Sequence, residues 1–152
     1  MKKIILLLVL TLSTVSFAQL KKVEAVKSEE IGKVGPFGLP KNIDCKKSGN
    51  IYTFEYKDMT YPNINEYKDF SFEDIDNTFE DLYKTISEGF ETLPKEGITL
   101  TLPNYIITLQ FTKAIGMNSV TIHTAPANNP SYVGHTIALS KKQIDKLFGK
   151  KK

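Results

Sequence analysis

An apolar stripe along residues 71–90 constrains the fold more than any other feature of the sequence. Large apolar residues recur there at intervals of four, three, four and four: Ile75, Phe79, Leu82, Ile86 and Phe90. This spacing predicts an amphipathic helix. Ser71 and Asp74 form a variant capping box at its start, and Gly89 or Pro94 is expected to end it. Because the stripe is continuous, the helix is expected to lie on a sheet.

The sequence on both sides of this helix predicts the strands of that sheet. Residues 51–57 alternate aromatic with polar side chains, the two-residue period of a half-buried strand, and a second short strand is expected near residues 66–70. After the helix, segments rich in Ile, Val, Thr and aromatic residues predict strands at residues 98–102, 105–113, 119–124 and 132–139. The short connections between them favour antiparallel pairing.

The end of the chain predicts a second helix. Ser140 and Gln143 form a capping box, and Gly149 supplies a stop. The whole order of elements predicts an α+β fold in two layers. We expect a mostly antiparallel sheet of about five strands, one long helix packed on it, and a short C-terminal helix.

The 152 residues are too few for two full domains, so one core is expected. Two glycines and two prolines at residues 35–40 form a turn, and the single α+β domain is expected to span residues 36–152. Residues 19–35 are charged and contain few large apolar side chains. We therefore expect these residues to form a flexible arm.

The first 18 residues have the pattern of a cleavable secretory signal peptide. Lys2 and Lys3 precede an apolar run, and small residues at positions 16 and 18 predict cleavage after Ala18. The alternative is a membrane anchor, but the apolar run ends at Thr11, short of the roughly 20 residues that span a bilayer. We expect a secreted or periplasmic protein without a membrane span.

The basic residues give no sign of a nucleic-acid partner. All 20 are lysines, so the planar arginine fork that binds phosphates with two parallel hydrogen bonds is absent. Cys45 is the only cysteine, so no disulfide can form within the monomer.

Three arrangements could carry chemistry. An acidic calcium loop starting at Asp74 lacks the required glycine and final glutamate, and a copper site of Cys45, Met117 and the two histidines has the wrong spacing. No metal and no cofactor are therefore expected. The third arrangement is a nucleophilic pair of Cys45 with His123 or His135, since neighbouring lysines would favour the thiolate. A small envelope hydrolase is thus the alternative function.

The position of the two histidines depends on strand register. If residue 123 stands opposite residue 135 in paired strands, the two imidazoles meet on one sheet face. A slip by one residue would set His135 against Ile122 and separate the rings.

The preferred function is a non-catalytic binding or interaction module of the cell envelope or exterior, and its partner is expected to be an envelope protein or a glycan. Proline-containing loops near residues 61–63 and 126–132 carry tyrosine and asparagine, which recognise partners at little ordering cost. Most of the aromatic residues at positions 52–72 are expected in the core. The candidate ligand-binding residues are Tyr61, Tyr67, Asn128, Asn129 and Tyr132.

Overall fold

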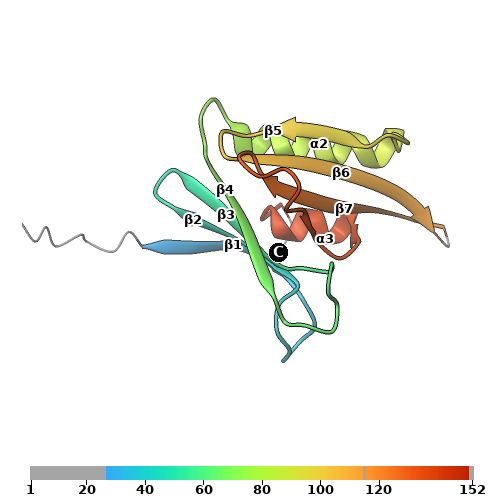
Figure 1. Cartoon of the computed structure of the whole chain (residues 1–152), viewed down its shortest axis with the longest axis horizontal. Coiled ribbons are helices and arrows are strands. Elements are labelled where there is room, and N and C mark those ends of the chain that lie inside the picture. The colour runs from blue at the N-terminus through green and yellow to red at the C-terminus, as the bar shows by residue number, and fades with distance from the viewer. Residues whose placement is uncertain (1–26, 115, 151–152) are drawn as a thin grey trace, which may run out of the picture.

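The computed structural model describes residues 27–114 and 116–150 and confirms the α+β class (Figure 1). Sheet A comprises β1 (Ser28–Val34), β2 (Ile43–Ser48), β3 (Ile51–Lys57) and β4 (Tyr67–Glu73). Sheet B comprises β5 (Ile98–Thr101), β6 (Tyr105–Ala114), β7 (Met117–Pro126), β8 (Gly134–His135) and β9 (Leu139–Ser140). The helices are α2 (Thr78–Thr92) and α3 (Lys141–Leu147). The expected signal peptide lies outside the described residues, as do residues 19–26 of the expected arm.

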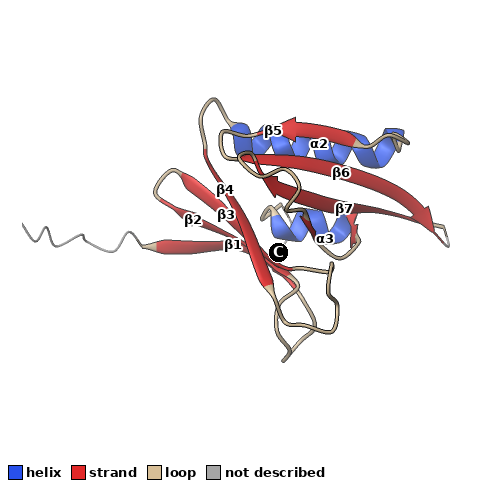
Figure 2. Cartoon of the chain, viewed as in Figure 1, coloured by secondary structure: helices blue, strands red, loops and turns tan. Residues whose placement is uncertain are grey.

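Sheet A corrects the prediction of one five-stranded sheet. Its four strands pair in chain order as an antiparallel meander, and the five remaining strands form a separate sheet (Figure 2). Residues 28–34, expected in the flexible arm, form β1 instead. Their side chains are mostly exposed, so the hydrophobic pattern is weak. The strand forms because its backbone pairs with β2 and its inner side packs against α3.

Sheet B is built on the long β6–β7 hairpin, with β5 beside β6. The strand expected at residues 132–139 is reduced to the short pairings of β8 and β9 with β7. Thr136 interrupts it, because its hydroxyl accepts a hydrogen bond from the backbone N–H of Ile122 at 3.1 Å. The Thr136 side chain thus takes the place of the backbone carbonyl that would accept this hydrogen bond in a regular strand pair.

The long helix begins later than its sequence predicts. β4 continues through Glu73, and Asp76 and Asn77 have positive φ angles of 53° and 65° before α2 starts. The Asp74 carboxylate accepts a hydrogen bond from the Phe79 N–H at 3.0 Å. Ile75 is 56% exposed and does not belong to the buried stripe.

The other four stripe residues of α2 are buried, as predicted. The ring of Phe79 stacks on Tyr52 of sheet A, with 3.9 Å between centroids, and Phe90 meets Phe111 of sheet B edge-on. The helix ends before Pro94, while Gly89 lies inside it against the ring of Phe111. One aromatic core therefore joins α2 to both sheets.

The short helix α3 begins with the predicted capping box of Ser140 and Gln143. In the described part of the chain, neither helix is long and apolar enough to cross a membrane.

Candidate functional site

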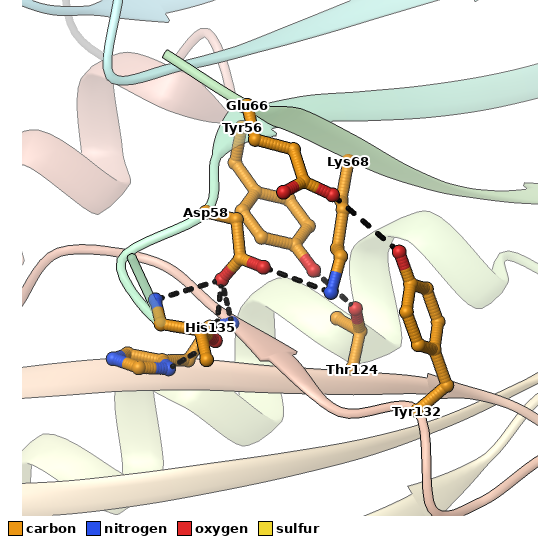
Figure 3. A network of polar contacts seen from close by, with 8 residues as sticks. Tyr56, Asp58, Glu66, Lys68, Thr124, Tyr132 and His135 are labelled. Carbon is orange, nitrogen blue, oxygen red and sulfur yellow. Dashed lines mark hydrogen bonds and ion pairs between the residues drawn. The ribbon is translucent and has the colours of Figure 1, made fainter. Parts of the chain in front are cut away.

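A buried carboxylate lies where the two sheets meet, just after the end of β3. The side chain of Asp58 is fully buried, and its Oδ1 atom accepts hydrogen bonds from the N–H and hydroxyl of Thr60 and from the N–H of His135 (Figure 3). These three distances are between 2.8 and 3.1 Å. Lys68 of β4 forms an ion pair with the other oxygen, Oδ2, at a distance of 2.8 Å from its Nζ atom.

This arrangement holds Asp58 in its charged form. Burial alone would raise the pKa of the carboxyl group, but the contacts of Lys68, Thr60 and His135 outweigh it and hold the pKa well below its usual range. Burial likewise acts to lower the pKa of Lys68, and Asp58 reverses this effect and raises it. The two charges therefore fix β3, β4 and β8 together.

Tyr132 covers this ion pair from the solvent side. Lys68 Nζ lies 3.9 Å from the centre of the Tyr132 ring, and the tyrosine hydroxyl donates to Glu66 at 3.4 Å (Figure 3). Behind them, the hydroxyls of Tyr56 and Thr124 share a buried hydrogen bond of 2.6 Å between the sheets.

Gly134 is required by this packing. A Cβ atom there would lie 2.6 Å from Lys68 Cδ and 2.7 Å from the hydroxyl of Tyr56.

Two hollows flank β4 in front of this network, and we call them together the β4 groove. One, of about 270 Å³, lies between residues Glu66, Tyr67, Lys68 and Asp69 on one side and Tyr105, Thr124, Pro126 and Tyr132 on the other. The second, of about 440 Å³, is lined by Ser71, Pro103, Asn104, Tyr105, Pro126, Ala127 and Asn128. Tyr105 and Pro126 line both hollows, so the two hollows adjoin each other. The groove is rich in the tyrosine, asparagine and proline side chains that bind partners at little ordering cost.

The structure brings three of the five sequence-predicted binding residues to the β4 groove: Tyr67, Asn128 and Tyr132. Tyr61 is 58% exposed in the loop before β4 and lines neither hollow. Asn129 lines neither hollow and shapes the loop instead, because its N–H donates to Pro126 and its carbonyl accepts from Tyr132.

The two histidines adopt the register that places them together. His123 of β7 stands opposite His135 of β8, and their rings stack with 5.2 Å between centroids. Burial, followed by the neighbouring His135, lowers the pKa of His123. Within residues 27–114 and 116–150, no group of three or more His, Cys, Asp or Glu side chains could hold a metal ion.

Cys45 does not join the histidines. It lies fully buried in sheet A between Gly32 and Phe54, whereas both histidines lie in sheet B. Burial and the adjacent Asp44 raise the pKa of its thiol to about 12, which opposes the thiolate that a nucleophile needs. Among the described residues, no hydrogen bond links the thiol to either imidazole.

Several residues of the site were not identified from the sequence: Asp58 behind the groove, and Glu66, Lys68, Asp69 and Tyr105 in its lining. Asp58 and Lys68 are ten positions apart, and only the β3–β4 pairing shows that they meet. Comparisons of the chain with protein-family models, curated proteins and solved structures find no match, so the geometry of the groove carries the argument for function.

Proposed function

We propose that this protein is an exported, non-catalytic binding module whose ligand lies in the β4 groove. The observation that carries the proposal is the combination of two adjoining hollows with a rigid support behind them. The support is the buried Asp58–Lys68 ion pair, which fixes the side of the groove formed by β4. Export is proposed from the pattern of the first 18 residues.

The surface of the groove suits binding. Tyr132 is 51% exposed, and its ring is held over Lys68, so little side-chain freedom is lost when a ligand contacts it. Pro103 and Pro126 restrict the two loops that line the second hollow. A preorganised surface of this kind gains affinity because fewer groups must be ordered on binding.

A panel of immobilised short peptides and envelope-type glycans tests the proposal with the full chain. Tyr132→Ala and Asn128→Ala should each weaken capture by roughly tenfold, since a well-placed tyrosine at an interface commonly contributes this much. Tyr61→Ala is the matched control, because Tyr61 is similarly exposed and lies outside the groove. Its capture should not change.

Melting temperatures should stay within a few degrees for all three variants, so that lost capture reports on the ligand site. Equal capture by the wild type, Tyr132→Ala and Asn128→Ala would contradict a ligand site in the β4 groove.

A further inference from the structure

One edge of sheet A is open along the β4 groove. Sheet A ends at β4, and within the described residues no strand pairs with its outer side. β4 has seven residues and pairs with β3 without a bulge. By contrast, β1 at the other edge carries a bulge near Gly32, and the β5 edge of sheet B has only four residues. Bulges and short strands are common protections against further pairing.

The hydrogen-bond pattern shows which backbone groups of β4 are free. The N–H of Asp58 donates to the carbonyl of Glu66, and the N–H of Asp74 donates to Asn50, both at 2.8 Å. In an antiparallel pair, bonded positions alternate. Lys68 and Phe70 therefore bond to β3, and the backbone groups of Tyr67, Asp69 and Ser71 point away from it.

These outward-pointing positions coincide with the groove. Tyr67 and Asp69 line the first hollow, and Ser71 lines the second. The groove therefore offers a row of backbone donors and acceptors with the spacing of a strand, beside the ring of Tyr105. An extended polypeptide segment has the complementary donors and acceptors at the same spacing.

The charges of sheet A select among such segments. Lys33, Asp44, Glu55 and Asp69 stand opposite one another in successive strands and form one row across the sheet. Lys41 forms ion pairs with the two central acids. At the open end of the row, no cation of the described residues forms an ion pair with Asp69, which is exposed.

The other charges of β4 leave its edge acidic. Lys68 is already paired with Asp58, so Asp69 and Glu73 of the strand, with Glu66 just before it, dominate the charge of this edge. A second copy of β4 would bring like charges together, and an acidic segment would be repelled. A basic residue opposite Asp69 would continue the row with an opposite charge.

We propose that the ligand of the β4 groove is an extended segment of a partner protein that adds to sheet A along β4 and places a lysine or arginine opposite Asp69. This inference rests on the proposed function and names the class of its ligand. The residues on either side of the basic one point to the opposite sheet face, toward Tyr105 and Tyr132. The recognised pattern is therefore an apolar residue, a basic residue and a second apolar residue.

The test begins with selection of short random peptides on the full chain. Selected peptides should share this pattern. The substitution Asp69→Lys should weaken their binding to the protein by roughly five- to tenfold. A peptide with glutamate in place of its basic residue should regain affinity for Asp69→Lys. Glu29→Lys is the matched control, since Glu29 is an exposed acid on the opposite edge of the same sheet.

N-methylated peptides test the strand pairing itself. In a segment that runs antiparallel to β4, the N–H of the basic residue faces Asp69, so methylation of this N–H should abolish binding. Methylation of the next residue, whose N–H points away from β4, should leave binding unchanged. The inference would be overturned by selected peptides whose binding depends neither on the charge at position 69 nor on the N–H of the residue opposite it.

The remaining outcomes separate the inference from the proposed function. Capture of glycans only, lost in Tyr132→Ala, would overturn the inference and uphold a binding site in the groove. A dimer of the chain that the selected peptides compete away would assign the edge to a second copy and also overturn the inference. Absence of any binding that depends on groove residues would overturn both.

Discussion

Lys68 Nζ lies 2.8 Å from Asp58 Oδ2, and this ion pair ties β4 to the end of β3 behind the β4 groove. Asp58 is fully buried, and the side chain of Lys68 is only 14% exposed. Two such charges are tolerated in the interior because each neutralises the other and the carboxylate accepts three further hydrogen bonds. We therefore expect this pair to stabilise the fold and to hold the β4 side of the groove in place.

Asp58→Asn should lower the free energy of unfolding by about 3 kcal/mol, because it leaves Lys68 charged without a partner in a largely buried place. Chemical denaturation of the wild type and the variant measures this difference. Asp69→Asn is the control, since Asp69 is exposed, and it should change stability by less than about 0.5 kcal/mol. Equal effects of the two substitutions would show that the ion pair does not stabilise the fold.

The stabilisation by Asp58 should depend on pH in the acid range. The folded protein holds the pKa of Asp58 well below the unfolded value of about 3.9. The contribution is therefore fully present above about pH 4 and is lost as the pH falls toward the folded pKa. Denaturation between neutral and acid pH should show the wild type and Asp58→Asn converging below about pH 4. A stability difference that stays constant down to strongly acid pH would contradict this account.

The thiol of Cys45 should be unreactive in the native protein. Its burial and its pKa of about 12 leave almost no accessible thiolate near neutral pH. A thiol-reactive dye should label the wild type only after a denaturant unfolds it. Fast labelling of the native protein would contradict the buried position and restore support for a catalytic cysteine.

Gly134→Ala should disturb the groove. The added methyl group would collide with the hydroxyl of Tyr56, which is fixed by its bond to Thr124, and with the stem of Lys68. We expect a loss of about 1–3 kcal/mol in stability, typical of overpacking, together with weaker ligand capture. A variant at Gly134 as stable as the wild type would show that this contact relaxes freely.

The sequence predicts those elements whose pattern is local. The β3 alternation, the β6–β7 strands and the Ser140 capping box are all found, because each depends on neighbours in the chain. β1 and β2 escape prediction because their polar residues become a strand pair only through sheet A and α3.

The start of α2 is missed for a related reason. Pairing with β3 extends β4 through Glu73 and outweighs the local helix start at Ser71. The candidate site also divides into residues with a local signal and residues without one. Local composition suggests Tyr67, Asn128 and Tyr132 as binding residues. Asp58 and Lys68 have no such signal, because only strand pairing brings them together.

Backbone amide exchange along β4, followed by NMR with and without a selected peptide, tests the open edge most directly. In the free protein, Lys68 and Phe70 should exchange slowly because they bond to β3, and Tyr67, Asp69 and Ser71 should exchange fast. Saturating peptide should slow exchange at Asp69 and its outward-facing neighbours and leave Lys68 and Phe70 unchanged. Unaltered exchange at Tyr67, Asp69 and Ser71 in the saturated complex would contradict the addition of a strand to β4.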